Sequence, residues 1–214
     1  MSGLAKWTVE PILADDQGRR FYLEHYKPFR LAALKQDPDA FGSTYTREID
    51  FIEEDWLSRI NNNLVKTFVA VPSNDRRVLS TTSLIGPLPN RDPESNPFQA
   101  CTEMTSASDQ HHNHVEASPL SFQLSGVYTT PEARGKGMAK AVVNTAVEEA
   151  VMYARQQNRK LNLSVVVYAS NHAAIAFYQS CSFVTDAEGP RTFFNSHKNC
   201  YEVELCMHYC RSPE

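Results

Sequence analysis

Residues 127–140 have the composition of a phosphate-binding turn. Their sequence, VYTTPEARGKGMAK, places Gly135 and Gly137 directly before a run with helical periodicity. Backbone N–H groups in the first turn of a helix lack intrahelical acceptors, and the helix dipole adds partial positive charge there. Glycine lets an anion approach this backbone closely, and Arg134 and Lys136 add charge. The segment therefore predicts an anion site at the start of the helix.

Two common phosphate-binding motifs do not fit this segment. The dinucleotide motif GxGxxG would need a third glycine where the chain has Lys140. The P-loop motif GxxxxGK[ST] needs glycines farther apart and a Ser or Thr after the lysine, and none follows Lys136. The pattern that remains is Arg-x-x-Gly-x-Ala, formed by Arg134, Gly137 and Ala139. A nucleotide-binding protein with a variant phosphate loop stays open as an alternative.

A second segment, residues 171–183 (NHAAIAFYQSCSF), follows a β-branched run and has the pattern of a short helix. Asn171 suits the N-cap, because its side chain can accept a hydrogen bond from the first turn. Phe177 fits either a core position or a ligand contact. The phenol of Tyr178 could bond a core carbonyl, or it could donate a proton or hydrogen bond to a sulfur leaving group.

Together the two segments resemble the signatures of the GNAT superfamily of acetyltransferases. The first motif, Arg/Gln-x-x-Gly-x-Gly/Ala, is matched at Arg134, Gly137 and Ala139. The second, Asn-x-x-Ala-x-x-x-Tyr-x-x-x-Gly-Phe, is matched at Asn171, Ala174, Tyr178 and Phe183. Position 182 is Ser where the family usually has Gly, at a helix end that often takes a left-handed conformation. The run DPDAFGSTY at 37–45 also resembles one found in many GNAT members.

The resemblance implies that acetyl-coenzyme A is the cosubstrate. In the family, the backbone amides of the first motif hold the pyrophosphate, and the preceding strand end pairs with the peptide-like pantetheine arm. The residues expected to bind it here are Val127, Tyr128, Thr129, Arg134, Gly135, Lys136, Gly137, Met138, Ala139, Lys140, Asn171, Ala174, Phe177 and Tyr178.

The reaction that the resemblance implies is direct acetyl transfer to an amine within a ternary complex. A backbone amide near Val127 would polarise the thioester carbonyl, and Tyr178, the predicted catalytic residue, would assist the leaving thiolate. A covalent route through Cys181 would need a base beside the thiol or a lowered pKa, and without one we expect Cys181 to pack. A catalytically silent acetyl-coenzyme A sensor or interaction module is the alternative function.

No general base stands out in the sequence. An amine with a pKa of about 10 is protonated at pH 7, so a base is needed, yet residues 117–131 contain no Asp or Glu. The candidates by residue type alone are Glu48, Glu103, Glu116, Glu204 and the histidines His111, His112 and His114. The resemblance implies that the acceptor is a small-molecule or peptide amine and that residues 26–60, 86–120 and 186–200 shape its site.

The pattern of the chain predicts a mixed α/β (α+β) fold. We expect helices over 16–36, 47–60, 133–158 and 172–180. We expect strands over 7–13, 66–72, 77–86, 121–130, 161–168, 182–186 and 200–209. The resemblance implies a mostly antiparallel sheet of six to seven strands flanked by helices, with one parallel β-α-β crossover at the acetyl-coenzyme A site. The whole chain, 1–214, is expected to be one domain with a long loop inserted at about 86–120.

Composition excludes several classes of protein. The net charge is −4 and no dense Lys/Arg run occurs, which argues against a nucleic-acid partner. The sequence contains no stretch of about 18 apolar residues, so it predicts no membrane span. The N-terminus lacks the apolar core of a secretion signal. We therefore expect a cytoplasmic protein without a membrane partner, and a homodimer is possible.

The five cysteines do not predict a metal site. Their number is odd and no pair has CxxC spacing, so we expect reduced, mostly packed thiols and no bound metal. The three histidines at 111–114 could bind a metal, but no acidic or Cys partner stands at matched spacing, and a solvated loop is favoured.

Overall fold

The centre of the protein is one mixed β-sheet. The computed structural model describes residues 6–88 and 118–210. Its strands are β1 (Trp7–Pro11), β2 (Val65–Pro72), β3 (Ser80–Leu88), β4 (Leu120–Thr129), β5 (Leu161–Tyr168), β6 (Phe183–Thr185), β7 (Arg191–Asn195) and β8 (Cys200–Tyr209). Their order is β1-β2-β3-β4-β5-β8-β6, and β7 pairs with β8 beside β6. Every pairing is antiparallel except that of β4 with β5, which confirms the expected fold class.

The described residues contain eight strands, one more than the expected upper count. The additional strand is β7, within residues 186–200, where the sequence pattern predicts no strand. A turn with Gly189 at φ +76° precedes it, and a turn ending at Asn199 with φ +54° follows it. The short aromatic run RTFFN between these turns pairs only with β8, so it lacks the long alternating pattern by which strands are recognised.

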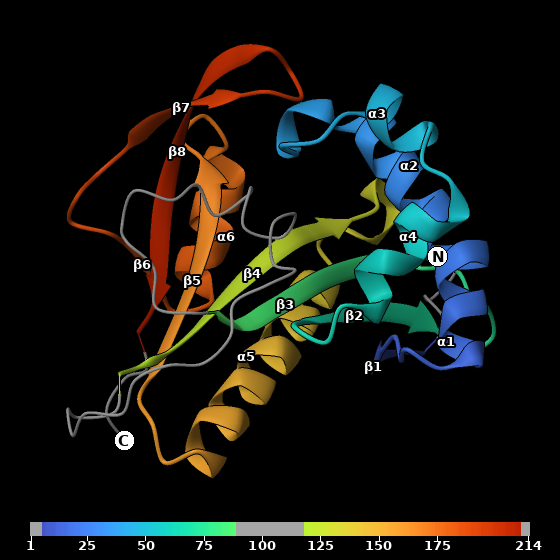
Figure 1. Ribbon diagram of the computed structural model, residues 1–214, viewed down its shortest axis with the longest axis horizontal. Helices are drawn as coiled ribbons and strands as arrows, with labels where there is room; N and C mark the ends of the chain where they lie inside the picture. The colour runs from blue at the N-terminus through green and yellow to red at the C-terminus, as the bar shows by residue number, and fades with distance from the viewer. Residues whose placement is uncertain (1–5, 89–117, 211–214) are drawn as a thin grey trace.

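Helices cover both faces of the sheet (Figure 1). One face carries α1 (Asp16–Phe21), η1 (Tyr22–Tyr26), α2 (Lys27–Gln36), η2 (Pro38–Ala40), α3 (Tyr45–Ile49) and α4 (Glu53–Asn61). The other face carries η3 (Pro131–Ala133), α5 (Met138–Gln156) and α6 (His172–Ser180). Side chains of β2 alternate between the two faces of the sheet. Phe68 packs in the cluster under α5, whereas Val69 and Val71 pack under the N-terminal helices. No helix within the described ranges is long and apolar enough to cross a membrane.

The single helix expected over 47–60 is wrong. The chain forms α3 and α4 with a break at residues 50–52 between them. Ile52 caps α4, where its N–H donates to the Asp55 carboxylate at 3.2 Å, so a new helix begins at Glu53. Ile49 and Ile52 are 44% and 62% exposed, whereas Trp56 and Ile60 are buried.

The parallel pair β4–β5 opens before either strand ends. Its pairing stops at Leu124 and Val165, although β4 continues to Thr129 and β5 to Tyr168. On the other side of β4, the pairing with β3 shifts at Gly126, which has φ +63° and lies in a β-bulge. The bulge increases the local bend, and the two strands diverge from this point (Figure 1). Residues 125–129 of β4 therefore form an open edge toward β5.

Candidate active site

The N-terminus of α5 is open to a ligand. Gly135 and Gly137 have φ of +74° and +82°, and a Cβ placed on either would meet no atom within 4 Å. Ala141 makes an intrahelical bond, with its N–H donating to the Gly137 carbonyl at 3.0 Å. The N–H groups of residues 138–140 precede that bond, and Gly137 has no side chain to cap them. This arrangement fits an anion such as a pyrophosphate.

The two basic side chains beside this helix start bind the protein itself. Arg134 donates to the Thr129 carbonyl at 3.1 Å and to the Asp37 carboxylate at 2.7 Å. Lys136 donates to the carbonyl of Glu132. Met138 is only 1% exposed and packs in the core. A ligand at this helix start could therefore contact the backbone of Met138 but not its side chain.

The open edge of β4 carries a tyrosine that points away from α5. Tyr128 is buried against Phe29 and Phe41, and its hydroxyl donates to Asp37 Oδ2 at 2.7 Å. Burial first, and then the hydrogen bond to Asp37, raise the pKa of Tyr128 to about 12. Val127 packs on the opposite face, against the cluster under α5. A ligand on this edge would therefore meet backbone groups of 127–129 rather than the phenol.

The second predicted segment folds as expected around Tyr178. Asn171 caps α6, with its Oδ1 accepting from the Ala174 N–H at 3.0 Å. Tyr178 is buried between Phe177 and Phe183, with ring centroids at 5.3 and 5.7 Å. Burial raises the pKa of Tyr178 above its ordinary value, so the phenol keeps its proton at neutral pH. No side-chain hydrogen bond from the described residues contributes to this shift.

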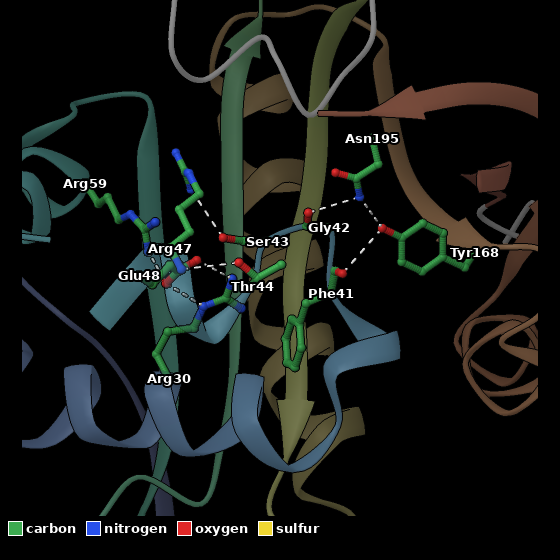
Figure 2. A network of polar contacts seen from close by, with 10 residues as sticks. All are labelled: Arg30, Phe41, Gly42, Ser43, Thr44, Arg47, Glu48, Arg59, Tyr168 and Asn195. Carbon is green, nitrogen blue, oxygen red and sulfur yellow. Dashed lines mark hydrogen bonds and ion pairs between the residues drawn. The ribbon is translucent and has the colours of Figure 1, made fainter. Parts of the chain in front are cut away.

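Residues 37–44, here named the strap, join the N-terminal helices to the two diverging strands. Asp37 holds Tyr128 and Arg134 at the end of β4. Farther along, the Phe41 carbonyl accepts from the Tyr168 hydroxyl at 3.4 Å, and the Gly42 carbonyl accepts from Asn195 Nδ2 at 3.1 Å (Figure 2). The strap thus reaches β4, β5 and β7 on the face opposite α6.

Sequence reasoning did not single out Asp37, Tyr168 or Asn195. The run at 37–45 resembles one found in GNAT members, so the sequence pointed to this segment. It did not show which residues the segment contacts. Those partners lie 91 to 153 positions away along the chain, so only the folded sheet brings them together.

Glu48, one of the candidate bases, has a structural role. Its carboxylate is fully buried and accepts from Arg30 at 2.9 and 3.2 Å and from Arg59 at 3.1 Å (Figure 2). These guanidinium groups outweigh the effect of burial and lower the pKa of Glu48 to about 2. A carboxylate so strongly held cannot accept a proton from an amine near pH 7.

Glu204, another candidate base, has no ion pair like that of Glu48 within the described part of the chain. It is buried on β8, directly opposite Tyr168 in the strand register. Its Oε2 atom has no hydrogen-bond partner among the described residues, and burial raises its pKa. The other candidates, Glu103, Glu116 and the histidines at 111–114, lie outside the described residues, as does most of the expected 86–120 loop.

The described cysteines are all free thiols. Cys181 is buried, and burial raises its pKa, in keeping with a packing role. Cys200 and Cys210 are exposed, so the expectation of mostly packed thiols is wrong for these two. Cys206 lies with His208 and Asp186 in a cluster that CxxC spacing could not reveal. Cys101 lies outside the described residues.

Comparison with known proteins matches this site to a family. The family model for the acetyltransferase (GNAT) family matches residues 99–183, a range that contains both predicted motifs. These matched residues are similar to the GNAT family. No curated protein sequence matches the chain significantly.

Solved structures support the GNAT fold along nearly the whole chain. A putative acetyltransferase from Acinetobacter baylyi has a TM-score of 0.61 at 14% identity, covering 98% of this chain and 97% of its own. NAA60 from Arabidopsis thaliana in complex with acetyl-CoA has a TM-score of 0.59 at 15% identity, covering 95% and 98%. Ribosomal-protein-alanine N-acetyltransferase from Brucella melitensis has 0.56 at 20% identity, covering 94% and 98%. At these identities the likeness concerns the fold.

Proposed function

We propose that this chain transfers an acetyl group from acetyl-coenzyme A to a small-molecule or peptide amine in a ternary complex. One observation carries the proposal: the open edge of β4 leads directly to the open N-terminus of α5. A pantetheine arm joined to a pyrophosphate has the polar groups to fill both, since its amides can pair with a strand edge and its phosphates suit a helix start.

The predicted binding residues would contact different portions of acetyl-coenzyme A. The backbone of residues 135–140 would bind the pyrophosphate, and the backbone of 127–129 would pair with the pantetheine amides. Asn171, Ala174 and Phe177 belong to α6, which packs beside β5 on the other side of the opening. The folded protein therefore offers groups on both arms of the opening.

The chemistry requires a donor near the leaving sulfur. During transfer the amine nitrogen forms a bond to the carbonyl carbon, and the carbon–sulfur bond breaks to leave a thiolate. Tyr178 would donate a hydrogen bond to that sulfur, because burial keeps its hydroxyl protonated at neutral pH. A backbone N–H of the open edge near Val127 would stabilise the oxyanion.

The attacking amine must also lose a proton. Among the described candidates, Glu204 is the one that combines an unpartnered oxygen with a raised pKa. It lies on the strap's side of the sheet, opposite Tyr168, where a water could connect it to an acceptor. We therefore assign it the role of base in the proposed reaction.

The test is an acetyl-transfer assay over a panel of amines: polyamines, aminoglycosides, amino acids and peptides with free N-termini. Replacing Tyr178 with Phe should lower kcat by about 100-fold, with little change in acetyl-coenzyme A affinity, because only the proton donor is lost. Tyr153→Phe on α5 is the matched control and should keep full activity.

Three other results would argue against the proposal. An unchanged turnover in Tyr178→Phe across the pH range would remove Tyr178 from the reaction. Tight acetyl-coenzyme A binding without transfer to any amine would support the sensor alternative. A larger thermal shift with ATP than with coenzyme A would support a nucleotide-binding protein.

A further inference from the structure

Three potential metal ligands converge on the sheet face opposite α6. Cys206 and His208 stand two positions apart on β8, so both side chains lie on the same face of the strand. Asp186 follows β6 directly and reaches the same place, with its N–H donating to the Cys206 carbonyl at 2.9 Å. The ligand atoms of the three residues all lie within 4.8 Å of one another.

Two of the three separations between the ligand atoms are close to those around a tetrahedral ion. Cys206 Sγ lies 3.5 Å from His208 Nε2, and that nitrogen lies 3.0 Å from Asp186 Oδ2. With zinc–sulfur and zinc–nitrogen bonds of about 2.3 and 2.0 Å, tetrahedral geometry separates sulfur from nitrogen by about 3.5 Å. The corresponding nitrogen–oxygen separation is about 3.3 Å, which needs a shift of a few tenths of an ångström.

The surrounding residues orient these ligands. His208 Nδ1 lies 3.3 Å from the Asn162 Oδ1 atom, so a proton on Nδ1 leaves the lone pair of Nε2 directed at the cluster. Asp186 Oδ1 accepts from the Glu188 N–H at 3.1 Å, which leaves Oδ2 toward His208. The side chains of His208 and Asp186 are 35% and 29% exposed, so solvent can reach a fourth coordination position.

We propose that Asp186, Cys206 and His208 bind a zinc ion, with Asn162 orienting the imidazole. A thiolate, an imidazole and a carboxylate together are a ligand set that zinc accepts, and three protein ligands leave one position for water. On binding, the sulfur forms a bond to zinc, and the thiol proton leaves to solvent. The two strands that meet at the site, β6 and β8, would be clamped together by the ion.

Two other arrangements of these residues explain less of the geometry. A Cys–His–Asp catalytic triad needs the thiol and the carboxylate at different ring nitrogens, whereas both face Nε2 of His208 here. A simple ion pair between Asp186 and an imidazolium would account for their contact. It would leave unexplained why the Cys206 sulfur and the Asn162 oxygen are also directed at the same ring.

The cluster adjoins the proposed base Glu204 but is made of other residues. In the β5–β8 register His208 stands opposite Ser164, whereas Glu204 stands opposite Tyr168 beside the strap. His208 is thus about 13 Å from the level of Glu204, and Cys206 about 7 Å from it on the same strand face. The zinc proposal therefore does not depend on the proposed reaction.

Titration of the metal-free full-length protein with Co²⁺ and Zn²⁺ tests the site. We expect one equivalent of Co²⁺ with a thiolate-to-metal charge-transfer band that Zn²⁺ displaces. Zinc at about 100 times its Kd should raise the Tm by several degrees. Cys206→Ser should abolish the band, and Asp186→Asn should weaken binding at least tenfold.

Two further variants sharpen the result. Cys200→Ser, at the exposed start of β8, is the matched control and should bind both metals as the wild type does. Asn162→Ala should keep the charge-transfer band but bind about tenfold more weakly, because it affects only the orientation of His208. Equal zinc binding by the wild type and Cys206→Ser, or Co²⁺ binding without the thiolate band, would overturn the proposal. If Cys206→Ser does not fold, unchanged zinc binding by Asp186→Asn would overturn it equally.

Discussion

A single carboxylate oxygen, Oδ2 of Asp37, connects the strap to the predicted cosubstrate site. It accepts hydrogen bonds from both the Tyr128 hydroxyl and Arg134, each at 2.7 Å. The bond from Tyr128, and then that from Arg134, lower the pKa of Asp37 despite the opposing effect of partial burial. The end of β4 and the turn before α5 therefore share one anchor.

Replacing Asp37 with Asn should disturb that anchor. Because the amide lacks the charge that holds Arg134, we expect the KM for acetyl-coenzyme A to rise about fivefold, equivalent to about 1 kcal/mol. The kcat should change less, since Tyr178 lies on another element. Steady-state kinetics would show this split, with Asp39→Asn as the exposed neighbouring control. A loss confined to kcat would contradict the anchoring role.

Glu48 makes a prediction about stability and pH. Its pKa of about 2 lies below an unfolded value of 4.5, so its carboxylate stabilises the fold fully above pH 4.5 and loses this effect as the pH falls toward 2. Glu48→Gln should lower the free energy of unfolding by about 3 kcal/mol at pH 7, because two buried arginine contacts lose their charge partner. The deficit should shrink at pH 3.

Urea unfolding at both pH values measures this effect. Glu54→Gln, on the exposed side of α4, should change stability by less than about 0.5 kcal/mol at either pH. A deficit that is the same at pH 7 and pH 3 would show that Glu48 contributes shape rather than charge.

At the scale of the element, two glycines allow α5 to begin without a side-chain cap. Gly137 has φ +82° and stands where the backbone must face a ligand. Gly189, in the turn before β7, has nearly the same φ, +76°, and is equally free of neighbours. Substituting Gly189 therefore measures the cost of the left-handed conformation alone, whereas substituting Gly137 adds the effect of blocking the site.

Alanine at either glycine should cost about 1 kcal/mol of stability, since each would hold an L-residue in the left-handed region. Gly137→Ala should also weaken acetyl-coenzyme A binding more than tenfold, because the new methyl group stands before the open N–H groups. Gly189→Ala should leave binding unchanged. Calorimetric titration and thermal melts of both variants would show whether the two effects separate.

Local patterns predicted those elements that local interactions define. The bounds of β5, β8 and α6 match the expectation because each is a β-branched, alternating or well-capped run, and Asn171 caps α6 as predicted. The helix break at Ile52 depends on one contact, between the Ile52 N–H and the Asp55 carboxylate. The apolar periodicity continues across this break, so the pattern predicted a single helix. The strap contacts and the approach of Asp186 to Cys206 and His208 could not be predicted, because only the strand order brings these residues together.

At the scale of the whole molecule, the strap joins the N-terminal helices to the C-terminal hairpin β7–β8. Asn195 is the central residue of this junction, donating to the Gly42 carbonyl, the Tyr168 hydroxyl and Glu202. It is buried, so its partners would lose bonds that water could not readily replace.

Asn195→Ala should therefore lower the free energy of unfolding by about 2–3 kcal/mol. Amide hydrogen exchange should speed up at residues 41–44 while the centre of α5 stays protected, because the opening is local. Asn144→Ala, on the exposed face of α5, should change neither quantity. Unchanged exchange in the strap would mean that other contacts hold it.

The early end of the β4–β5 pairing has a consequence for the lifetime of the protein. A sheet that lacks one partner along residues 125–129 reaches its full set of backbone bonds only with a bound arm, so the proposed cosubstrate would act as a missing strand. Ligands that bind only the folded state lower the population of opened chains that proteases can cut. Under the proposed function, a cell poor in acetyl-coenzyme A would then degrade the protein faster, which would couple its abundance to the supply of its cosubstrate.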